Sequence, residues 1–311
     1  MNKSTTPSSP SSQAVNDSAE HKAVKAYQGE PVLLLSTHAL TQHDFQRLSE
    51  LVYDHCGINL HQGKKELVDA RLVRLLRASR FQSVGEYVDF VIGNQRGIEF
   101  YALIDALCTN VTNFFREKEH FDYLGKVFLP ALLAKKRNLQ QTRIRGWSAA
   151  CSSGEEAYSI AMTLLAALPE RTNVNVKILA TDISSNMLTK ARQGVYERAQ
   201  TATVPASLQR RYFTAGMRGR EIVYEVVDAV RNAVQFAYLN LMEPWPFDGP
   251  FDFIFCRNVM IYFDKPTQQR LVNRFFDLLD RGGMLFTGHS ESLAGISHEF
   301  HYVRPTIYVK A

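Results

Sequence analysis

The fold of this chain is decided by the stretch RIRGWSAACSSGEEAYSIA, residues 143–161. Its first half, 144–150, consists mainly of apolar and small residues and predicts a buried strand. The Ser-Ser-Gly turn at 152–154 has so little side-chain bulk that a ligand can approach the backbone. Apolar residues then recur at helical spacing over 157–168, and Pro169 ends the helix. A strand, a small-residue turn and a helix in this order form the unit with which open α/β sheets bind nucleotides.

Two glutamates, Glu155 and Glu156, occupy the first turn of the predicted helix. The dipole of a helix favours negative charge at that position. The same carboxylates would repel a pyrophosphate, which needs glycines and an uncharged helix N-terminus, and one glycine, Gly154, stands where the dinucleotide fingerprint has three. The pattern therefore favours an adenosine cofactor that lacks phosphates and carries a positively charged end.

The composition is that of an ordinary globular protein. The chain has 311 residues, of which 45% are hydrophobic and 22% charged, enough for one large or two modest domains. No apolar run reaches the ~20 residues of a membrane span, and the N-terminal stretch lacks a secretory signal pattern. A net charge of +5 permits an acidic partner without requiring nucleic acid. We interpret the four cysteines, which form no C-x-x-C pair, as thiols in a reducing cytoplasm: Cys56, Cys108, Cys151 and Cys256.

Shifts in composition and periodicity divide the chain. Residues 1–36 are rich in Ser, Thr, Pro and Gln and predict a disordered tail. Residues 37–108 carry helical periodicity and predict an all-helical domain, and 109–117 form a connector. From 118 to 311 strands and helices alternate, apart from a small antiparallel insertion predicted at about 214–236.

A basic face runs along the helix predicted for residues 64–80. Apolar side chains fall on one arc of the helical wheel: Val68, Leu72, Leu75 and Leu76. Arginines fall on the opposite arc: Arg71, Arg74, Arg77 and Arg80. This face is either the solvated side of a core helix or a docking surface for an acidic helix.

Two polar features adjoin the predicted cofactor turn. The connector sequence TNVTNFFR, 109–116, either caps helices through Thr109 or Asn113 or supplies part of the wall of the site. Asp182 follows the second predicted strand. Its carboxylate can accept hydrogen bonds from a ribose, or it can cap the helix predicted at 184–192.

Other polar residues near strand ends have structural interpretations. We interpret Arg257 as an ion-pair partner or as a wall of a substrate channel, and His289 and Glu291 as loop structure after the last parallel strand. No spacing indicates a Ser-His-Asp set or a metal site, so we expect neither.

Six stretches in this order carry a resemblance to a known family: 109–116, 147–161, 180–183, 239–241, 255–264 and 282–291. The sequence resembles the chemotaxis receptor methyltransferases, which use S-adenosylmethionine to methylate receptor glutamates. The resemblance implies an α/β fold, a Rossmann-like class I methyltransferase with a doubly wound sheet and a terminal antiparallel hairpin. It also implies a small antiparallel β subdomain and an all-helical N-terminal domain that docks to the receptor.

The resemblance further implies cofactor contacts from the connector and from the carboxyl ends of strands. The residues are, in chain order, Asn110, Thr112 and Arg116 in the connector, Glu155 or Glu156 for the methionine part, Asp182 for the ribose, Asn240 and Leu241 for the adenine side, and Asn258 and Val259 for the reacting end. Arg116 and Asn258 would lie nearest to the chemistry. A glutamate substrate is already ionised at neutral pH, so no catalytic base is expected.

The implied partners are the cytoplasmic signalling helices of chemoreceptors, docked on Arg71, Arg74 and Arg77. Family members that tether to a receptor pentapeptide carry a longer loop than the compact segment at 215–222, so we expect no tethering. We expect a cytoplasmic monomer without membrane insertion, and S-adenosylhomocysteine as product. Two alternatives are a nucleic-acid methyltransferase, against which the lack of an aromatic stacking platform argues, and a non-catalytic module that binds the cofactor as a signal.

Overall fold

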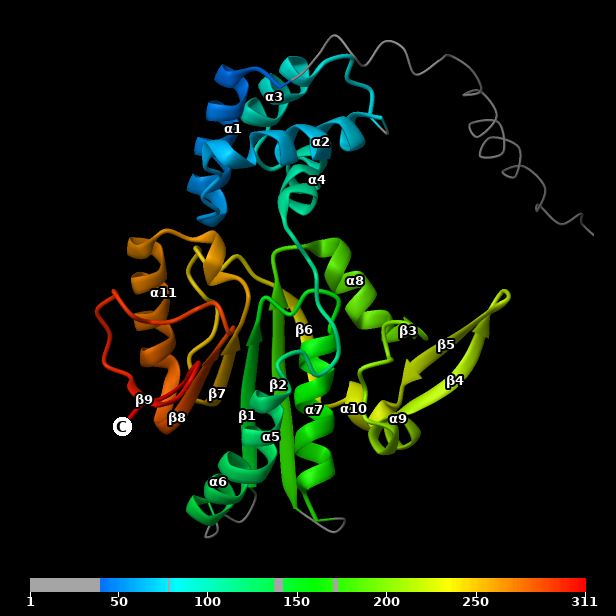
Figure 1. Cartoon of the computed structure of the whole chain (residues 1–311), viewed down its shortest axis with the longest axis vertical. Coiled ribbons are helices and arrows are strands. Elements are labelled where there is room, and N and C mark those ends of the chain that lie inside the picture. The colour runs from blue at the N-terminus through cyan, green and yellow to red at the C-terminus, as the bar shows by residue number, and fades with distance from the viewer. Residues whose placement is uncertain (1–39, 78, 137–141, 170–172) are drawn as a thin grey trace, which may run out of the picture. The chain divides into compact units, whose positions relative to one another are not determined.

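The computed structural model describes residues 40–77, 79–136, 142–169 and 173–311 (Figure 1). The tail expected at 1–36 lies outside the described residues. None of the described helices combines the length and the hydropathy that a membrane span requires.

The N-terminal part of the described chain is helical, as expected. Its α-helices are α1 (Gln42–Cys56), α2 (Lys65–Leu76), α3 (Val84–Gly93) and α4 (Ile98–Leu107), shown in blue to cyan in Figure 1. Thr41 caps α1, because its side chain accepts a hydrogen bond from the backbone N–H of Asp44 at 3.0 Å. Gly57 ends α1 in the left-handed conformation, with φ of 74°. Helix α2 ends at Leu76, earlier than the residue 80 expected from the sequence.

A seven-stranded sheet forms the centre of the C-terminal part. Its strands are β1 (Thr142–Ala149), β2 (Val174–Asp182), β6 (Val234–Tyr238), β7 (Phe251–Cys256), β8 (Leu279–Thr287), β9 (His301–Arg304) and β10 (Ile307–Val309). The order is β6-β2-β1-β7-β8-β10-β9, in which the first five strands are parallel and β10 and β9 antiparallel. The chain runs outward from β1 to both sides, which creates the switch point where doubly wound sheets bind ligands.

Helices cover both faces of this sheet. They include α5 (Lys118–Tyr123), the π-helical turn Leu124–Phe128, α6 (Leu129–Lys135), α7 (Glu155–Ala167), α8 (Ser185–Gln193) and α11 (Lys265–Leu278). Alternate residues of β7 enter different hydrophobic clusters. Phe253 and Phe255 pack in the cluster that contains residues of α5 to α7, and Ile254 and Cys256 pack in the one that contains residues of α11 and the N-terminal helices. This alternation confirms the doubly wound fold, because a strand buried on both faces needs apolar residues throughout.

A second, three-stranded antiparallel sheet has the order β3-β5-β4. Its strands are β3 (Val195–Glu197), β5 (Glu221–Val226) and β4 (Phe213–Arg218), and Figure 1 shows the β4–β5 hairpin projecting from the rest. The sheet thus begins at residue 195, earlier than the expected 214. The expected end at 236 is also too late, because β6 pairs in parallel with β2 in the central sheet. Short helices α9 (Ala206–Tyr212) and α10 (Asp228–Arg231) lie in the same part of the chain.

Candidate cofactor-binding and active site

A cavity lies at the carboxyl ends of β1, β2 and β7, at the switch point of the sheet. The connector, the loop after β6 and residues from the N-terminal helices complete its lining. Nine of the ten residues expected to contact the cofactor line it: Asn110, Thr112, Arg116, Glu156, Asp182, Asn240, Leu241, Asn258 and Val259. The tenth, Glu155, does not.

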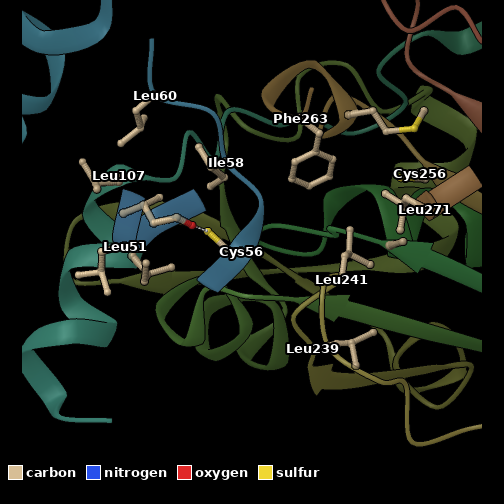
Figure 2. Close-up of a cluster of buried hydrophobic side chains, with 14 of the residues drawn as sticks. Leu51, Cys56, Ile58, Leu60, Leu107, Leu239, Leu241, Cys256, Phe263 and Leu271 are labelled. Atoms are coloured by element: carbon tan, nitrogen blue, oxygen red, sulfur yellow. Dashed lines mark hydrogen bonds between the residues drawn. The ribbon is translucent and has the colours of Figure 1, made fainter. Parts of the chain in front are cut away.

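One side of the cavity is apolar. Figure 2 shows the side chains that meet there, from the N-terminal helical part and from the loops after β6 and β7. Those that line the cavity are Cys56, Ile58, Leu60, Leu107, Leu239, Leu241 and Phe263. An apolar wall beside a few placed polar groups is typical of a site for a planar organic ligand such as adenine.

The turn after β1 is held in a strained conformation. The backbone N–H groups of Ala150 and Cys151 both donate to the carbonyl of Thr181, at 2.8 and 2.9 Å. Ala150 and Ser152 have positive φ angles of 71° and 50°, and such non-glycine strain concentrates at functional sites. Gly154 has φ of 96°, and a Cβ there would lie 2.9 Å from the Cβ of Ala191 on α8. The turn therefore requires glycine at this position.

The two glutamates of the turn point to different surroundings. Glu155 is 2% exposed, and its carboxylate accepts hydrogen bonds from Ser153 at 2.7 Å and Gln200 at 3.4 Å. Glu156 lines the cavity, where it accepts from the hydroxyl of Ser148 at 2.7 Å. Burial raises the pKa of Glu156, and the neighbouring guanidinium of Arg257 opposes the rise. Of the two alternatives, only Glu156 is placed to meet a ligand.

Asp182 stands at the end of β2 and is 6% exposed. Its carboxylate accepts from the backbone N–H of Ser152 at 2.7 Å and of Ser184 at 2.9 Å, so it joins the ends of β1 and β2. Burial raises the pKa of Asp182 to about 6. The alternative that Asp182 caps α8 is wrong, because Ser184 is the N-cap and accepts from the backbone N–H of Met187.

Arg257 is a buried ion-pair partner at the centre of the site, and it is 4% exposed. Its guanidinium lies 2.9 Å from Glu117 and 3.1 Å from Glu156, and it donates to the backbone carbonyl of Arg116. The same residue lines the cavity. The interpretation of Arg257 as an ion-pair partner is therefore confirmed. The arginine fixes the connector against α7 and balances the charge of Glu156.

The loop after β7 is shaped by Glu291, a carboxylate that is 5% exposed. It accepts from the backbone N–H groups of Asn258, Gly288 and Ile261 at 2.7, 2.6 and 3.2 Å. Asn258 has a positive φ of 59°. A Cβ at Gly288 would lie 2.6 Å from the Asn258 amide nitrogen, so the two loops fit closely. The interpretation of Glu291 as loop structure is confirmed, and its effect is to position Asn258.

The connector forms a wall of the cavity, and neither Thr109 nor Asn113 caps a neighbouring helix. The N-cap of α5 is Glu117, and the C-cap of α4 is Cys108, so the capping roles suggested for Thr109 and Asn113 are wrong. The carbonyl of Asn110 instead accepts from the Ser152 hydroxyl at 3.0 Å, which ties the connector to the turn after β1.

Arg71 differs from the role expected for it. It lines the cavity and donates to the Leu107 carbonyl at 2.5 Å and to the Thr109 hydroxyl at 2.9 Å. Arg74 and Arg77 are exposed. Of the three arginines expected to dock the receptor helix, Arg74 and Arg77 are therefore free of the connector, and Arg71 is engaged by it.

Residues of the N-terminal helical part also reach the site, which the sequence did not indicate. The amide of Asn240 donates to the His55 carbonyl at 2.6 Å, and the Asn59 N–H donates to the Tyr262 carbonyl at 2.8 Å. Lys64 and Tyr262 both line the cavity. The only signal in the sequence was the break after α1, which brings the chain back toward the sheet.

The fold and the cavity together define a class I methyltransferase. The sheet has the doubly wound order, and its first turn bears a glutamate and a single required glycine in place of a phosphate cradle. Both features fit a cofactor with an adenosine group and a cationic amino-acid end.

Comparison with known proteins agrees with this class. Residues 43–108 match the family model of the CheR methyltransferase all-alpha domain, and 110–309 match that of the CheR methyltransferase SAM binding domain. The chemotaxis protein methyltransferase of Borreliella burgdorferi is 41% identical over 273 residues, which are 87% of this chain and 95% of that protein. The Escherichia coli protein of that name is 41% identical over 87% of this chain and 91% of its own. Chemotaxis protein methyltransferase 2 of Pseudomonas aeruginosa is 43% identical over 87% of this chain and 94% of that protein.

The chain belongs to the CheR family of chemotaxis protein methyltransferases. Its cofactor is S-adenosylmethionine. The two family models meet at the connector, where the helical part of the chain gives way to the cofactor-binding part.

Proposed function

We propose that this protein methylates glutamate side chains on the cytoplasmic signalling helices of chemoreceptors. The products are glutamate γ-methyl esters and S-adenosylhomocysteine, and the process served is sensory adaptation. Family membership supports this function. The observation in the structure that carries it is the cavity at the switch point, with Glu156 and Asp182 beside the strained turn after β1.

The cavity suits a reaction that needs alignment rather than acid–base catalysis. When bound, S-adenosylmethionine supplies an electrophilic methyl group on a sulfonium. A glutamate with a pKa of about 4.3 is already ionised at neutral pH and can attack without a base. The contribution of the protein is to orient the two reactants and to exclude water.

The roles proposed for the lining residues follow their positions. Asp182 accepts from the ribose hydroxyls at the end of β2, and Glu156 faces the amino group of the methionine part. Asn258 borders the reacting end, in the loop that Glu291 holds. Arg116 lies beside it in the connector, whose backbone Arg257 binds. The remaining proposed contacts share the same cavity: Asn110, Thr112, Asn240, Leu241 and Val259.

The experiment that tests the function is a methyl-transfer assay with S-adenosylmethionine against a panel of chemoreceptor signalling domains, read by mass spectrometry of the peptides. We expect methyl groups on a few specific glutamates. An RNA sample in the same assay tests the nucleic-acid alternative. Methyl groups on RNA and none on any receptor domain would contradict the proposal.

The exposed arginines of α2 are proposed to steer the receptor helix. Reversal of one charge, Arg74→Glu, should slow receptor methylation by about three- to tenfold at low salt, because electrostatic steering raises association rates. The difference should shrink as salt is added. Affinity for the cofactor should not change, because Arg74 does not line the cavity.

The matched control for Arg74 is Arg281→Glu, an exposed arginine of β8. This control should methylate receptors at the wild-type rate. Equal rates for wild type and Arg74→Glu at low salt would show that α2 does not dock the receptor.

The small sheet is proposed not to bind a receptor pentapeptide. The β4–β5 hairpin pairs Arg218 with Glu221, so its turn is only Gly219 and Arg220. The longer loop of tethering family members has no counterpart here. Titration calorimetry with a C-terminal receptor pentapeptide should therefore detect no binding in the micromolar range, and a micromolar dissociation constant would show that this hairpin is sufficient.

The active unit is proposed to be a monomer. Light scattering after size exclusion, with and without cofactor, measures this directly.

A further inference from the structure

A cluster of one carboxylate and two imidazoles lies next to the cavity without lining it. Glu117 and His120 belong to the start of α5, and His289 lies in the loop after β8. Their potential ligand atoms all lie within 4.8 Å of one another. Glu117 Oε2 is 3.6 Å from His120 Nδ1 and 3.9 Å from His289 Nε2. His289, which lies 169 positions after His120 in the chain, thus approaches the same carboxylate oxygen as His120 does.

The hydrogen bonds of Thr306 determine which nitrogen of His120 carries the proton. The Thr306 hydroxyl donates to the carbonyl of Pro305 at 2.7 Å, so its oxygen is left to accept. His120 Nε2 lies 2.7 Å from that oxygen, and with the proton on Nε2 both contacts of the hydroxyl are hydrogen bonds. In a neutral ring Nδ1 then bears a lone pair.

The bare nitrogen faces another acceptor. The His120 side chain is 1% exposed, and Nδ1 has no hydrogen-bond partner among the described residues. It points to the carboxylate of Glu117, which accepts hydrogen bonds from the Arg257 guanidinium, the Asn258 side-chain amide and the His289 backbone N–H at 3.3, 3.4 and 3.2 Å. The His120 nitrogen is therefore a buried acceptor that faces a carboxylate and has no donor, which is unfavourable. A cation bound between the nitrogen and the carboxylate would give this nitrogen a partner.

The donor set and its spacing suit one class of cation. Imidazole nitrogen and carboxylate oxygen bind Zn²⁺ at about 2.0–2.2 Å, which places tetrahedral ligand atoms about 3.3–3.6 Å apart. The separations of 3.6 and 3.9 Å are close to that range. Glu119, with a 75% exposed side chain, has an oxygen 4.0 Å from His289 Nε2 and can supply a fourth ligand.

The charges around the cluster are compatible with a divalent ion. Arg257 binds the same oxygen of Glu117, but it is also paired with Glu156 at 3.1 Å. The charges nearby are therefore one guanidinium and three carboxylates, which belong to Glu117, Glu119 and Glu156. A carboxylate oxygen has two lone pairs and can serve a guanidinium and a metal together. His289 is half-exposed, which gives an ion access from solvent.

We propose that Glu117, His120 and His289 form a structural site for one divalent transition-metal ion of the Zn²⁺ type. The ion joins the start of α5 to the loop after β8. That loop contains Glu291, which positions Asn258. The bound ion would therefore stabilise the part of the cavity wall that contains Asn258.

The test is a calorimetric titration of the full chain with Zn²⁺ after removal of metals by chelation. We expect one equivalent to bind. The variant His289→Ala should weaken binding by at least about tenfold, because it removes a ligand. Because the His289 side chain is half-exposed, we expect this variant to fold like the wild type, and circular dichroism checks its folding. The matched control is His43→Ala, an 80% exposed histidine that lies 3.9 Å from Asp44, outside the cluster. It should bind like the wild type.

Two further measurements report on the metal site and do not require methyltransferase activity. Co²⁺ in place of Zn²⁺ should give the intense visible absorption of a tetrahedral complex in the wild type and not in His289→Ala. Saturating Zn²⁺ should raise the melting temperature of the wild type and of His43→Ala more than that of His289→Ala. Absence of saturable binding, or equal affinity in wild type and His289→Ala, would overturn the proposal. None of these outcomes depends on methyl transfer, so they leave the proposed function untouched.

Discussion

The variant Arg257→Met is expected to lose about 3–5 kcal/mol of folding free energy, because removal of one member of a buried ion-pair network leaves the others unpaired. Arg257 is 4% exposed and lies 2.9 Å from Glu117 and 3.1 Å from Glu156. Methionine has a similar length, so little of the loss arises from a cavity. Urea denaturation followed by circular dichroism measures the change.

Two companion variants separate charge from packing. Arg257→Lys keeps the charge but loses the forked geometry, so it should fall between wild type and Arg257→Met. The double variant Arg257→Met with Glu156→Gln should recover part of the loss, because one unpaired carboxylate is removed. If Arg257→Met unfolded within about 0.5 kcal/mol of the wild type, the arginine would not be the group that holds the connector against α7.

The second large effect is expected at Asp182. Replacement by alanine should weaken binding of S-adenosylmethionine by about tenfold or more, given ~1.5–3 kcal/mol for hydrogen bonds to a charged group. The carboxylate also holds the backbone N–H groups of Ser152 and Ser184, so its loss loosens the turn as well. Titration calorimetry with the cofactor measures the effect. The control is Asp105→Asn, a half-buried carboxyl nearby that does not line the cavity. Wild-type affinity in Asp182→Ala would rule out a ribose contact.

The same residue predicts how cofactor affinity depends on pH. Burial raises the pKa of Asp182 to about 6. A ribose hydroxyl that donates to the carboxylate stabilises its ionised form, so affinity is complete above the pKa and is lost as pH falls through it. Between about pH 7 and pH 5 the dissociation constant of the wild type should rise about tenfold. Asp182→Asn should bind more weakly at neutral pH and show a smaller rise, and an equal rise would assign the titration to Glu156.

The elements that the sequence predicted correctly are those with strong local signals. Helix α11 begins at its cap, because the Asp264 side chain accepts from the Thr267 N–H at 2.9 Å. Strand β7 is apolar except for Asp252, and it is buried throughout. The short strand β3 was missed, because three residues are too few to show a period and its pairing with β5 is distant in the chain.

The site was predicted where residues of the same turn act together and missed where distant segments meet. The choice between Glu155 and Glu156 depends on Ser153 and Gln200, which donate hydrogen bonds to the carboxylate of Glu155. One step along a helix turns a side chain by about 100°, and only tertiary packing decides which one enters the cavity.

Other parts of the site depend on contacts that no local pattern contains. The helical wheel placed Arg71 on the basic face of α2, but its side chain is hydrogen-bonded to Leu107 and to Thr109 of the connector. The cluster of Glu117, His120 and His289 joins residues that no spacing rule connects.

The central claim is that the cavity at the end of β1 holds the adenosyl cofactor between Glu156 and Asp182. A crystal structure of the protein with S-adenosylhomocysteine tests it most directly. We predict the ribose hydroxyls against Asp182, the amino group toward Glu156, and the adenine on the apolar wall that contains Leu241. A cofactor bound elsewhere, or a pyrophosphate seated over Gly154, would contradict it.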